Sequence, residues 1–140
     1  MRLDVSVNLL TMQALKNKKI KVFGGNQTRP NINIHDMVRV YQHFLKKDNI
    51  ESGFFNAGFE NISILDIAKK VQEKIPSEII VTSSNDPRSY RQNSDKLLKT
   101  GFEPKFNISD AIDEITKKFK VGVLTDEDIY YNLRVMKKIL

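Results

Sequence analysis

Short apolar runs alternate with longer amphipathic segments along this chain, and turn-forming residues separate them. This alternation limits the fold more than any other feature of the sequence. Runs rich in β-branched or aromatic residues predict strands, and apolar residues at intervals of three and four predict helices. The predicted strands cover 19–23, 31–34, 53–58 and 78–81. The predicted helices cover 3–17, 36–47, 63 to the residue before Pro76, 94–101, 108–119 and 125–140.

Such short strands do not form the long βαβ series of a complete doubly wound sheet. We therefore predict a small mixed α/β lobe with three or four short strands and five or six helices. Helix starts are marked by a capping residue followed three positions later by an aspartate. These pairs are Ser63 with Asp66, Asn107 with Asp110, and Thr125 with Asp128. Residues 82–93 (TSSNDPRSYRQN) are dense in turn formers and form the longest predicted irregular segment.

The composition fits one soluble domain of 140 residues. No cysteine is present, which excludes disulfides and thiolate metal ligands. No apolar run approaches the ~20 residues that span a bilayer, and the N-terminus does not resemble a signal peptide. We therefore expect a cytoplasmic protein. The net charge of +6 suits an anionic partner. Many of the lysines alternate with acids on predicted helix faces, however, so a solvated surface explains most of them.

Several catalytic signatures are missing from the sequence. It contains neither a G-x-G-x-x-G nor a G-x-x-x-x-G-K-[ST] phosphate loop. No Tyr-x-x-x-Lys pair occurs that could transfer a proton. The two histidines, His35 and His43, have no accompanying ligand cluster, so we assign them structural or surface roles. The sequence therefore predicts no catalytic, cofactor-binding or metal-binding residue in this chain.

Three arginines lie in predicted loops next to strands, where a guanidinium is well placed to bind phosphate. Arg29 follows the Gly24-Gly25 turn, and Arg88 and Arg91 flank Tyr90 in the irregular segment. A guanidinium stays charged and can donate to two phosphate oxygens at once. The alternatives are solvation at the surface or a structural ion pair with Asp36 or Asp86.

Six short motifs occur in an order that resembles the C-terminal portion of extended short-chain dehydrogenases/reductases, the NAD-dependent nucleotide-sugar epimerases and dehydratases. Each motif alone is weak, and their shared order and spacing carry the resemblance, which runs from the first residue to about Phe119. The motifs are RLDVSVN at 2–8, GGNQTRP at 24–30, NIHD at 33–36, FNAG at 55–58, DPRSYR at 86–91 and GFEP at 101–104.

The resemblance implies roles for individual residues. Asn8 is expected to help hold the diphosphate or nucleotide, and Arg29 to contact the nucleotide end. Arg88, or Arg91, corresponds to a second arginine on the diphosphate, with Tyr90 between them; the spacing leaves the choice between the two arginines open. Asp36 is expected to order the lobe rather than to touch substrate.

The resemblance also implies what lies outside this chain. An N-terminal Rossmann half would hold NAD or NADP and carry the Tyr-x-x-x-Lys pair, and this sequence starts beyond it. We therefore expect residues 1–120 to form the substrate-binding lobe and 121–140 its C-terminal helix, inactive alone. The expected partners are a nucleotide-diphosphate sugar and a Rossmann domain on the same or a separate chain.

Two other functions are compatible with the sequence. A lobe separated from its domain exposes apolar surface, so the chain could instead be a non-catalytic interaction module that pairs with a separate Rossmann half or self-associates. A small basic nucleic-acid binder rests on charge alone, because the sequence lacks a recognised nucleic-acid-binding motif. We expect neither a nucleic-acid nor a membrane partner.

Overall fold

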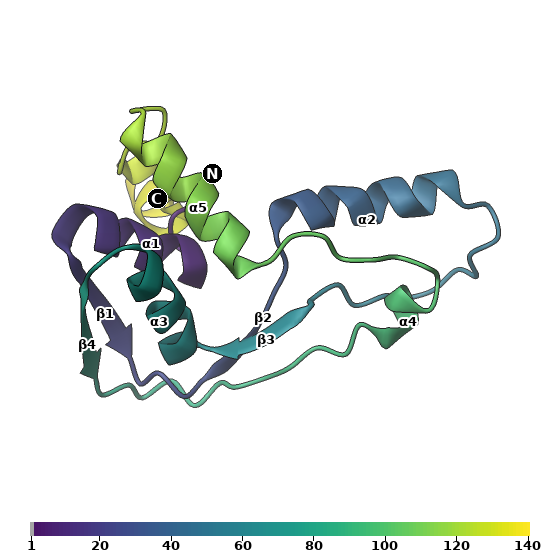
Figure 1. Cartoon of the computed structure of the whole chain (residues 1–140), viewed down its shortest axis with the longest axis horizontal. Helices are drawn as coiled ribbons and strands as arrows, with labels where there is room; N and C mark the ends of the chain where they lie inside the picture. The colour runs from purple at the N-terminus through teal and green to yellow at the C-terminus, as the bar shows by residue number, and fades with distance from the viewer. Residues whose placement is uncertain (1) are drawn as a thin grey trace.

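The chain folds into a compact α/β end and a slender arm that extends from it (Figure 1). The computed structural model describes residues 2–140. Its elements are α1 (Ser6–Asn17), β1 (Lys19–Phe23), β2 (Thr28–Asn31), α2 (Ile34–Lys46), β3 (Glu60–Ser63), α3 (Ile64–Lys74), β4 (Glu78–Thr82), α4 (Asp95–Leu98), α5 (Ile108–Lys120), the 3-10 turn η1 (Asp128–Tyr130) and α6 (Asn132–Ile139). The predicted mixture of short strands with five or six helices is confirmed.

Two separate two-stranded sheets organise these parts. β1 pairs in parallel with β4, with Ile20 opposite Ile79. β2 pairs antiparallel with β3, with Arg29 opposite Ile62. The first sheet lies with α1, α3 and α5 in the compact end, and the second leads into the arm that carries α2 and α4 (Figure 1).

The largest apolar cluster lies between the first sheet and the helices of the compact end. Alternation along β1 buries Ile20 and Val22 and leaves its other residues exposed, as the period of a strand requires. Apolar residues on one face of each helix complete the cluster. They are Val7, Leu10 and Ala14 of α1, Ile67, Ala68 and Val71 of α3, and Ile108 and Ile112 of α5.

A second cluster in the arm joins α2 to α4 and to residues 101–106. Val40, Leu97 and Phe102 are buried there, with Phe44 and Phe59 packed against them. Both ends of the molecule therefore have apolar cores of their own, and the arm does not depend on the first sheet for its packing.

Asp36 joins the start of α2 to the segment that leads into α5. Its carboxylate is fully buried. It accepts hydrogen bonds from the backbone N–H groups of Lys105, at 3.0 Å, and Phe106, at 2.9 Å, and from the guanidinium of Arg39. These contacts give Asp36 the ordering role that the sequence predicted, because buried backbone donors and a buried charge are satisfied together.

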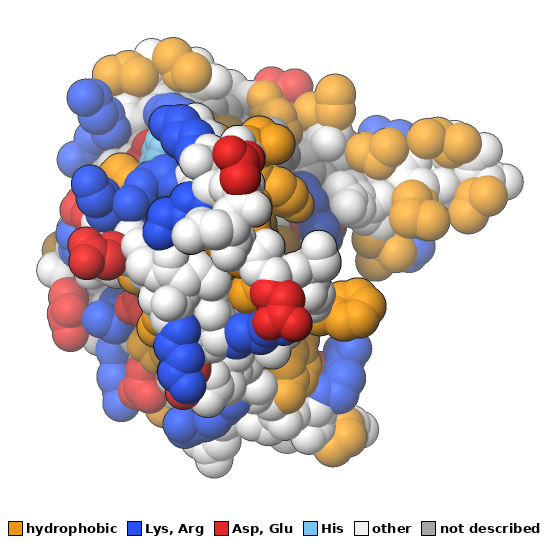
Figure 2. All heavy atoms as spheres, turned by 90° about the vertical axis from the view of Figure 1, so that its right-hand side faces the viewer, with side chains coloured by type: hydrophobic (Ala, Val, Ile, Leu, Met, Phe, Trp, Pro, Cys, Tyr) orange, Lys and Arg blue, Asp and Glu red, His pale blue; other side chains and the backbone are white. Residues whose placement is uncertain are grey.

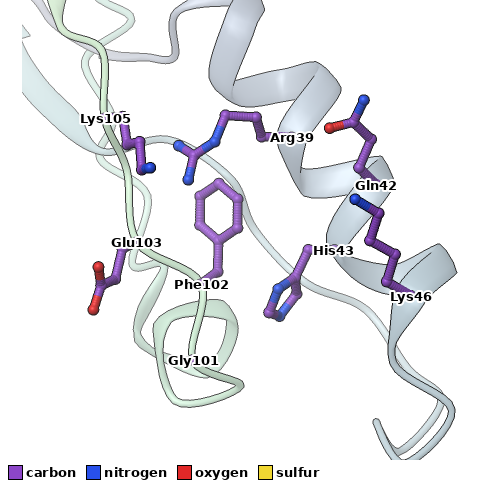
Figure 3. A pocket seen from close by; sticks show the side chains of 8 residues that line it. All are labelled: Arg39, Gln42, His43, Lys46, Gly101, Phe102, Glu103 and Lys105. Carbon is purple, nitrogen blue, oxygen red and sulfur yellow. The ribbon is translucent and has the colours of Figure 1, made fainter.

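A small hollow of about 340 Å³ opens beside this joint, between α2 and residues 101–105 (Figure 3). The side chains of Arg39 and Lys105 approach it from opposite sides, with the ring of Phe102 between them (Figure 3). The guanidinium of Arg39 lies over that ring, 5.2 Å from its centroid. Since the guanidinium of Arg39 is already paired with the carboxylate of Asp36, it serves to connect α2 to residues 105–106.

Three sequence-based element assignments are wrong. Residues 53–58 form no strand; Gly58 is instead held by Ser94, whose hydroxyl accepts from the Gly58 N–H and donates to its carbonyl. The strand predicted at 31–34 lies at Thr28–Asn31, because the side chain of Asn33 accepts from the N–H of His35 and starts α2 two residues early.

The C-terminal helix is the third correction. It does not begin at Thr125, whose hydroxyl donates to Glu127 instead of capping a helix. Tyr131 turns into the core in an extended conformation and donates its hydroxyl to Asp126, which separates η1 from α6. The caps at Ser63 and Asn107 are confirmed, the latter as a complete capping box with Asp110.

Apolar side chains also remain at the surface, as the space-filling view of the arm's end shows (Figure 2). The exposed ones include Ile34, Val38, Tyr41 and Leu45 on α2, and Leu133, Met136 and Ile139 on α6. Within residues 2–140, no helix has the length and apolar character required to cross a bilayer.

Candidate functional site

The turn after β1 positions Arg29 next to the irregular segment 83–94. Gly24 and Gly25 both adopt positive φ angles, of 75° and 105°. Such angles suit glycine, because it has no Cβ. A Cβ on Gly24 would lie 2.5 Å from Nε2 of Gln27. The Gln27 side chain fits into this turn, where it accepts from the Gly25 N–H at 2.8 Å. The Gly-Gly turn therefore fixes the entry into β2, on which Arg29 lies.

Hydrogen bonds tie the irregular segment to both strands of the second sheet. The Thr28 N–H donates to the hydroxyl of Ser89 at 3.0 Å, and the Tyr90 N–H donates to the Thr28 carbonyl at 3.2 Å. Further along, Asn61 of β3 exchanges two hydrogen bonds of 2.9 Å with the backbone of Gln92. Although this segment has no regular secondary structure, several of its backbone polar groups have partners on β2 and β3, which hold the loop against the sheet.

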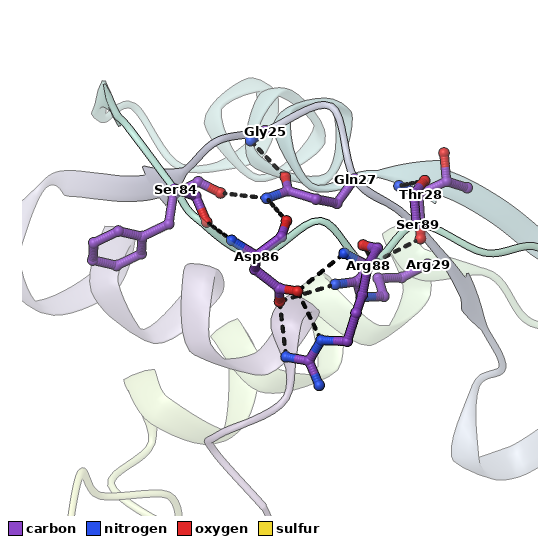
Figure 4. A network of polar contacts seen from close by, with 9 residues as sticks. Gly25, Gln27, Thr28, Arg29, Ser84, Asp86, Arg88 and Ser89 are labelled. Carbon is purple, nitrogen blue, oxygen red and sulfur yellow. Dashed lines mark hydrogen bonds and ion pairs between the residues drawn. The ribbon is translucent and has the colours of Figure 1, made fainter.

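Asp86 is the centre of the polar network in this segment (Figure 4). Its two carboxylate oxygens accept from Nε and Nη2 of Arg88, at 2.7 and 2.8 Å, a bidentate pair. One oxygen also accepts from the Arg88 backbone N–H at 3.1 Å, and the other lies 3.5 Å from Nη2 of Arg29. These hydrogen bonds, first of all that from the Arg88 side chain, lower the pKa of Asp86 to about 2.

The two arginines differ in how much of the guanidinium is free. The Arg29 side chain is 20% exposed and also donates to the carbonyls of Thr28 and Arg88. Its guanidinium lies 5.1 Å from the ring centroid of Tyr90, a cation–π contact. Arg88 is 76% exposed, and Asp86 occupies only one edge of its donor fork. Arg29 is therefore held in place, whereas Arg88 can still donate to a ligand.

The network contains two permanent positive charges and one carboxylate, so it retains an excess of one positive charge. It brings together Arg29, Arg88 and Tyr90 from the set of predicted site residues. Arg91 is exposed and lies outside this network. Both Arg29 and Arg88 therefore pair with Asp86, as one of the alternatives from the sequence stated, and part of the Arg88 guanidinium stays free.

Asn8, the remaining predicted site residue, lies in a different part of the molecule. Its side-chain amide donates to the Arg2 carbonyl at 2.6 Å. Asn8 and Arg29 both line a cavity of about 780 Å³ between the N-terminal ends of α1, α2 and α5 and the strand β2. Arg88, Tyr90 and Arg91 do not line it. Arg29 is thus the residue that connects the cavity to the Asp86 network.

Apolar side chains make most of the wall of this cavity, and polar residues of α1, β2 and α5 complete it. Its apolar lining is made by Val5, Val7, Pro30, Ile32, Ile34, Met37, Ile64, Ile108, Ala111 and Ile115. Cavities with mainly apolar walls and few polar groups are typical ligand sites.

A polar group on α5 at the edge of this cavity was not anticipated from the sequence. Glu114 pairs with Lys118 at 2.6 Å and with His35 at 3.0 Å. The hydrogen bond from Lys118 lowers the pKa of Glu114. The i, i+4 spacing of Glu114 and Lys118 is a signal that could have indicated this pair.

A metal centre finds no support in the part of the chain that the structure describes. No group of three or more histidine or acidic side chains comes close enough together there to hold a metal ion. His35 pairs with Glu114, and His43 with the hydroxyl of Thr100 at 2.7 Å. These partners fit the structural or surface roles expected for both histidines.

Comparison with solved structures identifies the fold. The chain has the fold of the C-terminal part of extended short-chain dehydrogenases/reductases, and the solved structures that share it include sugar-nucleotide epimerases and dehydratases and an L-threonine 3-dehydrogenase. No protein-family profile matches the sequence.

Three solved structures illustrate the likeness. UDP-glucuronic acid 4-epimerase from Bacillus cereus, solved with UDP-glucuronic acid and NAD, is 25% identical with a TM-score of 0.69, and the match covers 86% of this chain and 41% of that one. The NDP-hexosamine 5,6-dehydratase TunA is 20% identical with a TM-score of 0.70 and the same coverages. dTDP-glucose 4,6-dehydratase from Bacillus anthracis, solved with NAD, is 15% identical with a TM-score of 0.69, over 96% of this chain and 43% of that one.

The chain therefore spans about two fifths of the length of these three structures. A curated protein that matches in sequence is dehydrodolichyl diphosphate synthase 1 of Arabidopsis thaliana, 25% identical over 104 residues. That alignment covers 74% of this chain and only 33% of the plant protein. Its name denotes a different activity from those of the solved structures, and a match to one third of a protein assigns no activity to this chain.

Proposed function

We propose that this chain is the part of an NAD(P)-dependent nucleotide-sugar epimerase or dehydratase that binds the nucleotide diphosphate, and that it has no activity alone. The observation that carries the proposal is the pair of guanidinium groups held together by Asp86. The fold supports the same proposal, because the solved structures that share it include an epimerase in complex with UDP-glucuronic acid.

Arg88 is the proposed diphosphate ligand. Its fork is mostly exposed, and the donors that do not face Asp86 can reach two phosphate oxygens. Arg29 contributes positive charge and holds the segment 86–90 against β2 through its bonds to backbone carbonyls. The ring of Tyr90 restrains the Arg29 guanidinium from one face.

The remaining predicted residues have lesser roles in the proposal. Asn8 lies on the cavity that Arg29 also lines, so it is the proposed contact to the part of the ligand that enters this cavity. Arg91 is exposed beside the network and adds to the attraction of an anion without a defined contact.

The chemistry would need groups from outside these residues. Proton transfer in this class of enzyme is attributed, by resemblance, to a Tyr-x-x-x-Lys pair, which this sequence does not contain. NAD or NADP would be held by a dinucleotide-binding domain, since this sequence has no Gly-rich phosphate loop. The contribution of this chain is to bind and orient the nucleotide end of the substrate.

Isothermal titration of the chain with UDP, ADP, GDP, CDP and dTDP tests the proposal. We expect at least one diphosphate to bind, and Arg88→Ala to weaken that binding about tenfold, because hydrogen bonds to charged groups contribute roughly 1.5–3 kcal/mol. Unchanged binding by Arg88→Ala would contradict the assignment.

Arg134→Ala is a matched control for this experiment. Like Arg88, Arg134 pairs with an aspartate: its Nη1 lies 3.0 Å from Oδ1 of Asp128. Its removal changes the net charge by the same amount at a distant position on α6. Equal losses in Arg88→Ala and Arg134→Ala would show that overall charge, and no specific site, attracts the diphosphate.

A further inference from the structure

The C-terminal helix α6 is amphipathic, but its apolar side faces solvent. Leu133, Met136 and Ile139 are 64%, 56% and 78% exposed, and Leu140, directly after the helix, is fully exposed. Their intervals of three or four residues place them on one side of a helix, and we call these four residues the α6 face. No residue of α6 is buried. In contrast, α5 turns its apolar side inward and buries Ile108, Ile112 and Ile115.

Ion pairs hold α6 in this orientation. Arg134 and Lys138, on the other side of the helix, both donate to the carboxylate of Asp128 in η1, at 3.0 and 2.8 Å. The guanidinium of Arg134 also lies 3.9 Å from the ring centroid of Tyr131, which is buried in the compact end. The polar side of α6 is therefore tied to the molecule, and its apolar side is left for another surface.

Basic side chains are concentrated around the α6 face. Residues 117–140 carry six basic and three acidic side chains, so they supply half of the net charge of +6. Lys137 is exposed and lies one turn after Leu133, at the border of the face. An apolar helix face bordered by cations is typical of helices that lie in the headgroup layer of a bilayer. A second copy of this chain is a poorer occupant, because two chains of the same net charge repel each other.

We propose that the α6 face binds the surface of a bilayer that contains anionic phospholipids, with α6 lying in the plane of the headgroups. The apolar side chains would enter the boundary between headgroups and acyl chains, and Lys137 would attract lipid phosphates. The sequence alone gave no reason to expect a membrane partner, because no apolar run is long enough to span a bilayer. A helix that lies on the bilayer surface does not need that length, and the outward orientation of its apolar side is visible only in the structure.

This surface is separate from the proposed diphosphate site. α6, drawn in yellow, lies at the compact end of the molecule, and the segment between β4 and α4 that carries the Asp86 network runs along the opposite edge (Figure 1). A membrane bound at the α6 face would therefore leave Arg88 accessible. The titration with nucleoside diphosphates and the binding to vesicles can fail independently of each other.

A single fluorescent residue tests the proposal. The chain contains no tryptophan, so Met136→Trp places one tryptophan at the centre of the α6 face. We expect its emission to shift to shorter wavelength when vesicles of phosphatidylcholine and phosphatidylglycerol are added, and to shift much less with phosphatidylcholine alone. No shift, or an equal shift with both kinds of vesicle, would overturn the proposal. A shift that depends on protein concentration without vesicles would also overturn it, because a second copy would then cover the face.

Leu45→Trp is the matched control for this experiment. Leu45 is an apolar residue on another helix, α2, and is 83% exposed. We expect the emission of Leu45→Trp to stay unchanged when the same vesicles are added. An equal shift at both positions would show non-specific adsorption and would overturn the assignment to α6.

Sedimentation with the anionic vesicles measures the contribution of single side chains. We expect Ile139→Asp to weaken binding about tenfold, because a large apolar side chain no longer leaves water. Lys137→Ala should weaken binding about fivefold through the loss of one charge near the lipid surface. Leu45→Asp should bind as the parent chain does, and all three variants should keep the parent's circular dichroism spectrum because these side chains are exposed. Binding by Ile139→Asp equal to that of the parent chain would contradict the proposal.

Discussion

Asp36 and Asp86 each hold an arginine and accept backbone N–H groups, but their surroundings differ. Asp36 is fully buried and its three donors come from two parts of the arm, so it serves as a joint. Asp86 is 31% exposed and holds Arg88, whose guanidinium faces solvent. The same pair of residue types therefore gives a structural joint where water is excluded and a candidate anion site where it is not.

The physical reason is the cost of exchanging partners. A guanidinium that leaves a buried carboxylate, such as that of Asp36, leaves the buried charge without a partner, which costs several kcal/mol. At the surface, water and ions screen both charges, and the ion pair itself contributes little. Arg88 can therefore share its donors with a phosphate, whereas Arg39 stays with Asp36.

The largest expected effect is the loss of the joint. Asp36→Ala leaves the N–H groups of Lys105 and Phe106 and the charge of Arg39 without a partner, so we expect the unfolding free energy to fall by about 3–5 kcal/mol. Urea denaturation followed by circular dichroism measures this. Asp86→Ala is the matched change at the surface, and an equal loss in both variants would remove the distinction between the two sites.

A smaller effect is expected when the guanidinium of Arg88 is replaced by an ammonium group of the same charge. Arg88→Lys retains a cation but cannot donate to two phosphate oxygens in parallel. We expect diphosphate binding to weaken by about threefold, between the parent chain and Arg88→Ala, with no change in fold. If Arg88→Lys binds as tightly as the parent chain, charge alone is sufficient and the bidentate contact is wrong.

The smallest expected effect is on the free energy of unfolding at acidic pH. The pKa of Asp86 is lowered to about 2 by Arg88 and Arg29. A carboxyl with a lowered pKa stabilises the fold above its unfolded value of roughly 4, and this contribution is lost as the pH falls toward 2. The stability difference between the parent chain and Asp86→Asn should therefore shrink between pH 5 and pH 2, as urea denaturation at each pH would show. A constant difference over that range would contradict the ion pair.

Local signals predicted much of the fold from the sequence. The capping pairs at Ser63 and Asn107 depend on side chains three residues apart, and both are present. The strand at 19–23 was also predicted correctly, because its alternation of polar and apolar residues is complete within five positions. Such features need no information from distant parts of the chain.

Tertiary contacts explain the errors. The run at 53–58 looks like a strand, but Gly58 is bound by Ser94, and β2 pairs with β3 instead. The burial of Tyr131 interrupts the helix expected from Thr125. Neither contact is visible in local sequence patterns.

The candidate site was predicted in part. The sequence pointed to Arg29, Arg88 and Tyr90, which the fold brings together, and it offered both Asp36 and Asp86 as ion-pair partners; only the fold shows that Asp86 binds both Arg29 and Arg88. Asn8 could not be placed relative to Arg88 without the fold. The exposure of Ile34, Val38, Tyr41 and Leu45 was not predicted, because residues at this spacing also fit the buried face of an amphipathic helix.

The measurement that tests the central claim most directly is an NMR titration of the arginine side chains. The Nε–Hε signals of Arg29, Arg88 and Arg39 are assigned. A nucleoside diphosphate that binds in the calorimetric titration is then added to saturation. We predict that the signal of Arg88 shifts most, that of Arg29 shifts less, and that of Arg39 remains in place. A shift at Arg39, or none at Arg88, would contradict the account.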